Sequence, residues 1–161
     1  MPRISNTEII HQLSQPVISI RSTVTEADLH NFIAGSFEKM SGYLREIRES
    51  ISNVPLAIYH NYQNMDNEID VEAVFQVTKL LPEKDGIKSY MLPENRLVHS
   101  MFLGSENDMD NLYAELEKWI NLNGFKIIGP TYEYYYNNED FGIENLLIKF
   151  AIPVTHKRWD K

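Results

Sequence analysis

The sequence predicts an α+β fold made of two strand–helix–strand–strand repeats, with an antiparallel sheet and two long helices. Two segments carry apolar residues at helical spacing, and the segments around them are rich in β-branched and aromatic residues. Both halves of the chain place these elements in the same order. A chain of 161 residues is long enough for one domain in which two halves share a core. We therefore expect a single domain, 1–161, with repeats at about 16–80 and 95–154. The connector at 81–94 is expected to contain a short extended piece at 87–92.

The first repeat opens with a β-rich run that leads into a helix start. Thr25 supplies a hydroxyl and Asp28 an acid three residues later, a pattern typical of a helix N-terminus. The helix is expected to stop near Asn53 and Pro55, because proline cannot continue it. The predicted strands are 16–24, 56–62 and 70–80, with a turn at 64–67, and the helical stripe consists of Leu29, Phe32, Ile33, Phe37, Met40, Leu44, Ile47 and Ile51.

The second repeat follows the same order. Ser105 and Asp108 again place a hydroxyl and an acid at the helix start. Asn123 and Gly124 form a good helix end, because glycine accepts the left-handed backbone conformation. The predicted strands are 95–103, 131–137 and 144–154, with a turn at 137–143, and the helical stripe consists of Met109, Leu112, Tyr113, Leu116, Trp119 and Ile120.

Landmarks in the two halves are separated by a nearly constant number of residues. Pro55 and Pro130 are 75 residues apart, and so are Phe75 and Phe150. This self-similarity favours a duplicated unit. With the same offset Glu133 corresponds to Ile58, an apolar residue of the first half, so only one half carries a carboxylate at this position.

Composition excludes several classes of function. The chain has no cysteine, which excludes disulfides, thiol catalysis and thiolate metal sites. Its five histidines show no metal spacing, and no phosphate-binding loop or nucleophile elbow is present, so we expect no metal and no cofactor. A net charge of −8 repels phosphate backbones, so no direct contact with nucleic acid is expected. Without a long apolar run or a signal peptide, we expect a cytoplasmic protein with no membrane contact.

The segment TYEYYYN contains the strongest candidate site. In a strand alternate residues share a face, so Glu133 and Tyr135 point one way while Tyr132, Tyr134 and Tyr136 point the other. A carboxylate among aromatic rings loses hydration. A cationic ligand can restore its ionised form, with cation–π attraction of about 0.5–2 kcal/mol per contact. The alternative is that Glu133 lies on a wet sheet face among ordinary strand tyrosines.

Three short stretches and one helical motif resemble a known family. The chain is similar to the gyrase-inhibitor-like (GyrI-like) small-molecule-binding domains, which also form the effector-binding part of some AraC-type and mercury-resistance-type transcription regulators. The resemblance covers about residues 16–154 and implies two strand-helix-strand-strand (SHS2) units with pseudo-twofold symmetry. The motifs are Pro55-Leu56-Ala57-Ile58-Tyr59, Pro130-Thr131-Tyr132-Glu133-Tyr134-Tyr135, Ile152-Pro153-Val154 and Leu116-x-x-Trp119-Ile120.

The resemblance also implies a ligand site. Family members bind flat, often cationic, organic molecules in a cleft between the halves. The family glutamate falls on Glu133 and the family tyrosine on Tyr135. His60 and Asn61 depart from the family pattern, which often has a second tyrosine or an acid there. The expected ligand-binding residues are Glu133, Tyr135, Tyr59, Trp119, Tyr43 and Tyr113. For Trp119 and Tyr113, which lie on the helical stripe, the alternative is a place in the core, where such residues more often lie.

Three functions remain open. The first is a bacterial stand-alone effector-binding module, related to transcription regulation, that takes flat and possibly cationic compounds such as aromatic cations. The second is a hydrolase of reactive small molecules, in which Glu133 activates water and Tyr135 polarises the electrophile. The third is an inhibitor that binds a protein partner through its acidic surface.

Overall fold

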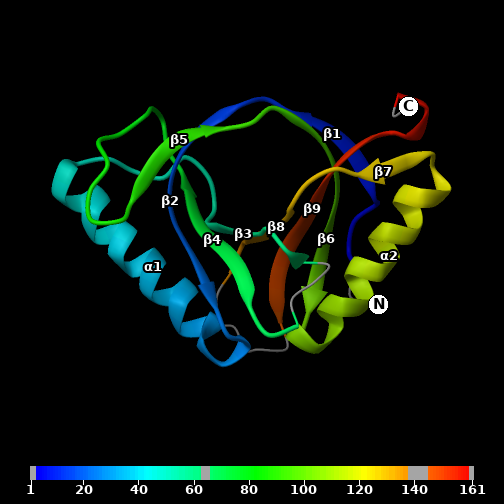
Figure 1. The fold of residues 1–161 in the computed structure, drawn as a ribbon, viewed down its shortest axis with the longest axis horizontal. Coiled ribbons are helices and arrows are strands. Elements are labelled where there is room, and N and C mark those ends of the chain that lie inside the picture. The colour runs from blue at the N-terminus through cyan, green and yellow to red at the C-terminus, as the bar shows by residue number, and fades with distance from the viewer. Residues whose placement is uncertain (1–2, 63–65, 138–144, 160–161) are drawn as a thin grey trace. The chain divides into compact units, whose positions relative to one another are not determined.

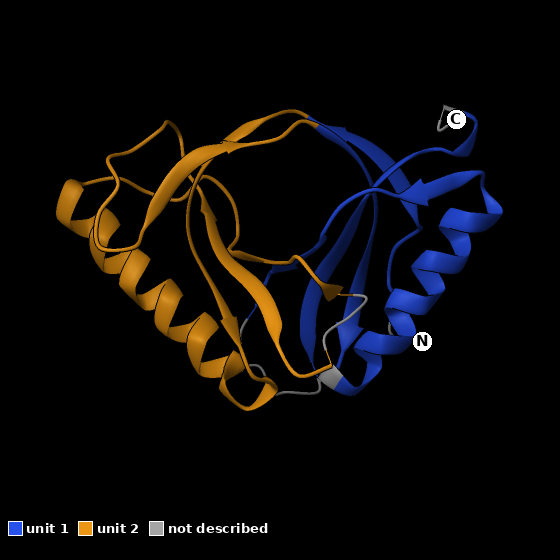
Figure 2. Ribbon diagram, viewed as in Figure 1, with its two compact units in different colours: residues 1–12, 95–161 blue, residues 13–94 orange. Residues whose placement is uncertain are grey.

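The computed structural model describes residues 3–62, 66–137 and 145–159. The chain forms two compact units, shown in different colours in Figure 2. Unit 2 is continuous and comprises residues 13–94. Unit 1 combines residues 1–12 with residues 95–161. Each unit has one long helix and antiparallel strands, which confirms the predicted α+β class.

Unit 2 contains a four-stranded antiparallel sheet in the order β3-β4-β2-β5. Helix α1 lies along one face of this sheet (Figure 1). Apolar side chains of the helix, including Met40 and Leu44, pack there against Ile18 and Phe75. The elements are β2 (Gln15–Val24), α1 (Glu26–Ile47), β3 (Leu56–Tyr59), β4 (Ile69–Gln76) and β5 (Lys88–Leu92).

The ends of α1 differ from the predicted ends in one respect. Thr25 is the N-cap residue as expected, and its hydroxyl donates to the Asp28 carboxylate over 3.1 Å. The helix stops at Ile47 because Arg48 adopts a left-handed conformation, with φ of 60°. The backbone N–H groups of Arg48 and Glu49 then donate to the carbonyls of Arg45 and Leu44. This local cap ends the helix before Asn53 and Pro55 are reached.

Unit 1 contains strands in the order β1-β6-β9-β8, and β7 pairs with a different part of β9. Helix α2 packs on the face that carries Phe150, whose ring meets the ring of Tyr113 edge-on at 6.2 Å. Gly124 ends the helix region with φ of +81°, as the sequence predicts. The elements are β1 (Glu8–Gln12), β6 (Asn95–Gly104), α2 (Met109–Leu122), β7 (Phe125–Ile127), β8 (Thr131–Tyr135) and β9 (Leu146–His156).

Several elements were not expected from the sequence. Strand β1 lies in the N-terminal segment and pairs only with β6 among the described strands. None of its residues is fully buried, so buried and exposed positions alternate only weakly along it. Strand β7, which precedes the aromatic strand, was also not expected, whereas β5 lies in the connector 81–94 at the extended piece expected for 87–92. The Ser105–Asp108 motif forms a 3-10 turn, in which the Asp108 carboxylate accepts from the Ser105 backbone, and α2 begins after it. The predicted turns at 64–67 and 137–143 fall largely outside the described residues.

Candidate functional site

Strand β8 holds the predicted pair of Glu133 and Tyr135. The Tyr135 hydroxyl donates to Oε1 of Glu133 over 3.2 Å, so the two side chains share a face as the alternation predicts. Glu133 is only 8% exposed, and Tyr135 is half-buried. The carboxylate is therefore shielded from water, which argues against the alternative of a wet sheet face.

The register of β8 places Glu133 opposite Phe150 of β9. In unit 2 the corresponding strands pair Ile58 with Glu72. The paired residues are 17 apart in unit 1 (150 − 133) and 14 apart in unit 2 (72 − 58), a difference of three. Side chains alternate between the two faces of a strand, and three is odd. Residues of β3 and β8 that are 75 apart in number therefore lie on opposite faces relative to the residues that their partner strands carry. Glu133 therefore shares a face with the helix-packed Phe150, and Ile58 is not its structural counterpart.

The opposite face of β8 carries two more tyrosines. Tyr132 and Tyr134 are both buried, with ring centroids 6.5 Å apart. Nζ of Lys149, on the neighbouring β9, lies 4.3 Å from the centre of the Tyr134 ring. Burial raises the pKa of Tyr134 and lowers the pKa of Lys149. Strand β8 thus has a carboxylate on one face and a cationic amine beside the other.

A second buried carboxylate lies in unit 2, on the sheet face away from α1. Glu72 of β4 is 4% exposed. Its Oε1 lies 2.8 Å from Nε2 of His60, and its Oε2 accepts a hydrogen bond of 2.5 Å from the Tyr90 hydroxyl. The Ser19 side chain is also hydrogen-bonded to it. We call Glu72, His60, Tyr90 and Ser19 the Glu72 centre.

The Glu72 centre stabilises the ionised carboxylate. Burial alone raises the pKa of Glu72, but the hydrogen bonds from His60, Tyr90 and Ser19 outweigh it and hold the pKa below its ordinary value. An ionised carboxylate only accepts hydrogen bonds, so the His60 ring nitrogen at 2.8 Å acts as a donor. The charge of Glu72 is therefore met by donors from its own unit.

The other predicted aromatic residues lie in different environments. Tyr43 of α1 is buried in the core of unit 2, and its hydroxyl donates to the Pro82 carbonyl. Tyr59 is buried in β3 and meets the Tyr62 ring edge-on at 6.0 Å. Tyr113 is buried against Phe150, so its ring faces the core of unit 1.

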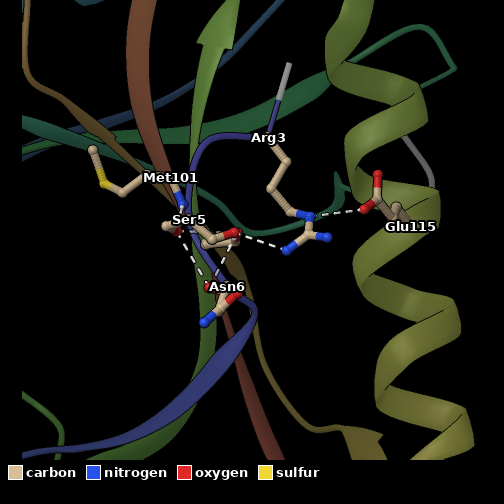
Figure 3. Close-up of polar contacts among 6 residues, drawn as sticks. Arg3, Ser5, Asn6, Met101 and Glu115 are labelled. Carbon is tan, nitrogen blue, oxygen red and sulfur yellow. Dashed lines mark hydrogen bonds and ion pairs between the residues drawn. The ribbon is translucent and has the colours of Figure 1, made fainter. Parts of the chain in front are cut away.

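Trp119 lines a surface groove of about 620 Å³ in unit 1. Figure 3 shows the polar contacts that fix one wall of this groove. Nε of Arg3 donates to Oε1 of Glu115 over 3.0 Å, and Nη1 of Arg3 donates to the Ser5 carbonyl over 2.8 Å. The Ser5 hydroxyl accepts from the backbone N–H of Met101 at 2.8 Å. Glu133 does not line this groove, which is bounded by Arg3, Asn6, Thr7, Glu8, Glu115, Lys118, Trp119 and Leu122.

The sequence analysis did not single out two charged residues, the buried Glu72 and the half-buried Lys149. Each interrupts an otherwise apolar strand, in DVEAVFQV and LLIKFAIPV. A charged residue at such a position is a usable signal, because charged side chains are almost never fully buried unless they are paired. The partners of Glu72 come from separate elements, so the sequence spacing could not reveal them.

Within residues 3–62, 66–137 and 145–159, no three His, Asp or Glu side chains are arranged to hold a metal ion. No helix in the described part of the chain combines the length and apolar character needed to cross a membrane.

Solved structures with a similar fold come from several proteins. EcmrR bound to DNA has 15% sequence identity to this chain and a TM-score of 0.82. The match covers 94% of this chain but only 58% of the EcmrR chain. The EcmrR C-terminal domain is 16% identical with a TM-score of 0.73, covering 95% of this chain and 99% of that one. A hydrolase from Listeria innocua is 11% identical with a TM-score of 0.71, covering 96% and 94%. SAV2435 bound to tetraphenylphosphonium is 12% identical with a TM-score of 0.61, covering 93% and 94%.

These likenesses, all at low identity, show a shared fold. No curated protein matches the chain in sequence. The sequence pattern of the GyrI-like small molecule binding domain matches residues 5–155, which is nearly the whole chain. The chain therefore belongs to the family of GyrI-like small molecule binding domains.

Proposed function

We propose that this chain binds flat aromatic compounds, including aromatic cations, and that Glu133 is the charge partner of the ligand. The observation that carries the proposal is a carboxylate only 8% exposed on an aromatic strand, 3.2 Å from the Tyr135 hydroxyl. An anion in such surroundings has lost much of its hydration. A bound cation would stabilise the ionised carboxylate in place of the lost water, so a buried carboxylate favours a cationic ligand.

The family and its relatives support this ligand class. The family is one of small molecule binding domains. SAV2435, which has a similar fold, is bound to tetraphenylphosphonium, a cation surrounded by aromatic rings. A tyrosine-rich strand suits such a ligand, because aromatic faces attract cations electrostatically. We propose Tyr135, whose hydroxyl donates to Glu133, as the residue that orients the carboxylate.

The experiment is a calorimetric titration with tetraphenylphosphonium. Wild-type protein is expected to bind it, and Glu133→Gln is expected to weaken binding about tenfold or more, because a charge-assisted contact is lost. Glu46→Gln is the matched control, since Glu46 is an exposed residue of α1 that pairs with Lys84. Equal affinities of wild type and Glu133→Gln would show that Glu133 is not the charge partner.

A second candidate function is hydrolysis of reactive small molecules. The Tyr135 hydroxyl and the Glu133 carboxylate are adjacent, which provides a proton donor and a base in one place. The base would take a proton from water while the hydroxyl polarises the electrophile. Incubation with epoxides tests it: turnover that disappears in Glu133→Gln supports the reaction, and a rate equal to that in buffer removes it for those substrates.

A further inference from the structure

The groove beside Trp119 lies within unit 1, between helix α2 and the N-terminal segment, and has a volume of about 620 Å³. Residues 3 and 6–8 line one wall. Residues of α2 spaced by three or four positions, and therefore on one side of the helix, line the other wall: Glu115, Lys118, Trp119 and Leu122. Sites for small molecules usually measure about 300–1,000 Å³, so the groove has room for a compound with two fused rings.

Polar contacts hold the two walls together at the Arg3 end of the groove. Figure 3 shows the Arg3 side chain reaching Glu115 of α2, with 3.0 Å between Nε and Oε1. The same guanidinium donates to the Ser5 carbonyl, and the Ser5 hydroxyl accepts from the backbone N–H of Met101 in β6. The N-terminal wall is therefore tied to both the helix and the sheet, and no ligand is needed to form the groove.

Trp119 and Leu122 give the groove an apolar surface. Trp119 is half-buried, so part of its side chain remains open to solvent. Leu122 is 75% exposed, more than any other large apolar side chain among the described residues. A ring that covers these two side chains removes apolar surface from water, which favours binding. An aromatic ring suits the position, because its face can stack on an indole.

Lys118 is the charge that α2 presents to this apolar surface. Glu115 lies three residues before Lys118, a spacing at which opposite charges on a helix commonly pair. In the structure, however, Glu115 pairs with Arg3. Lys118 is exposed, and its side chain has no ion pair or hydrogen bond within the described residues. The ammonium of Lys118 is therefore available to an anion in the groove.

Glu8 also borders the groove, but its carboxylate is directed away from α2. Glu8 of β1 is paired with His99 of β6. The next residue, Ser100, is paired with Phe150, which contacts α2. Because neighbouring residues of a strand point to opposite faces, His99 and Glu8 lie on the sheet face away from the helix. The charge beside the apolar surface of the groove is therefore positive.

We propose that this groove is a second binding site, separate from that of Glu133, which takes an aromatic carboxylate. The ring lies against Trp119 and Leu122, and the carboxylate pairs with the Lys118 ammonium. A carboxylate has only acceptors, which suits an ammonium group with three donors. Glu133 does not line the groove, and the ligand proposed for Glu133 has the opposite charge.

Calorimetric titration with 1-naphthylacetate and its neutral analogue 1-naphthylacetamide tests the proposal. Naphthylacetate is expected to bind about two- to fivefold more tightly, the modest gain of an exposed charge pair, and Lys118→Met is expected to remove the difference. Lys39→Met is the matched control, because Lys39 is an exposed lysine of the other helix, α1. Equal affinities for the two compounds, or a difference that persists in Lys118→Met, would overturn the assignment.

Glu115→Gln is expected to have the opposite effect and to tighten naphthylacetate binding about two- to fivefold. The glutamine oxygen still accepts from Arg3, so the walls stay tied while one negative charge is removed. Opposite effects of two substitutions on one side of α2 cannot come from a loss of folding. Weaker binding in Glu115→Gln would contradict the charge assignment. Glu133→Gln is expected to retain naphthylacetate binding, which separates this site from the proposed cation site.

The indole N–H signal of Trp119 in heteronuclear NMR spectra tests the place of binding. The chain has two tryptophans, and Trp119→Phe identifies the Trp119 signal by its loss. Naphthylacetate is expected to shift this signal in the wild-type protein. A Trp119 signal that stays unchanged at concentrations that saturate the calorimetric titration would mean that the compound binds elsewhere, and would overturn the site independently of the charge variants.

Discussion

The Tyr90 hydroxyl donates to Oε2 of Glu72 over 2.5 Å, and the two residues lie on different strands of unit 2. Tyr90 is on β5 and Glu72 on β4, with β2 between them. The bond therefore crosses a strand and helps to hold a carboxylate that is 4% exposed. It is one of three side-chain hydrogen bonds that compensate for the burial of this charge.

Removing the Tyr90 hydroxyl is expected to destabilise the protein. Tyr90→Phe leaves the buried Glu72 carboxylate without one donor, which costs about 1.5–3 kcal/mol of unfolding free energy. Urea unfolding followed by circular dichroism measures it. Tyr136→Phe is the control, because the Tyr136 side chain is exposed and its change is expected to stay within about 0.5 kcal/mol. Equal loss in both variants would mean that the bond to Glu72 contributes little.

The Glu72 centre is also expected to make stability depend on acid pH. The pKa of Glu72 is lower in the folded protein than its ordinary value of 4.5. The unfolded state therefore binds more protons, and the contribution of Glu72 is complete above pH 4.5 and is lost as the pH falls through the folded pKa. Unfolding free energies of wild type and Glu72→Gln between pH 6 and pH 3 test this. The difference between the two proteins should change over that range, and a constant difference would contradict the assignment.

Lys149 is expected to lower stability at neutral pH. Burial lowers its pKa from 10.5, so the unfolded state binds the proton more tightly than the folded state. Stability conferred by this residue therefore rises as pH increases from the folded pKa towards 10.5. Lys149→Met removes the charge and keeps an unbranched side chain over Tyr134, so its unfolding free energy should equal or exceed that of wild type at pH 7. The difference in unfolding free energy between the two proteins should narrow as the pH rises towards 10.5, and a difference that does not change with pH would contradict this account.

Two glycines offer a matched test of backbone conformation. Gly124 has φ of +81° and Gly35 lies inside α1, and an added Cβ meets no atom within 4 Å at either position. Gly124→Ala is expected to lower the unfolding free energy by about 1–2 kcal/mol, because an L side chain disfavours positive φ. Gly35→Ala is expected to raise it by about 1 kcal/mol through helix propensity. Thermal unfolding of both variants measures the two signs, and a shared sign would show that packing dominates at one site.

Local signals in the sequence were sufficient for the helices and most strands. The apolar stripe of α2 and the glycine at position 124 predict that helix and its end. The end of α1 could not be predicted, because it depends on a left-handed Arg48, a conformation that side chains such as arginine rarely adopt. Strand β1 was missed because its partner, β6, lies far along the chain.

The candidate site was predictable only in part. Alternation along β8 correctly groups Glu133 with Tyr135, since that depends on neighbouring residues alone. Strand register is set by pairing between distant segments, so the correspondence of Glu133 with Ile58 was wrong. The Glu72 centre requires residues from β2, β4, β5 and the segment after β3 to converge, and no local pattern encodes that convergence.

The assembly of unit 1 from two distant segments has a consequence for synthesis on the ribosome. Its first strand, β1, is made before any part of unit 2, yet its partner β6 is made after the whole of unit 2. Strand β9, which pairs with β6, β7 and β8, comes later still. Unit 2 can therefore complete its own sheet while β1 is waiting with an unpaired edge, a state in which chaperones and neighbouring nascent chains have access to it.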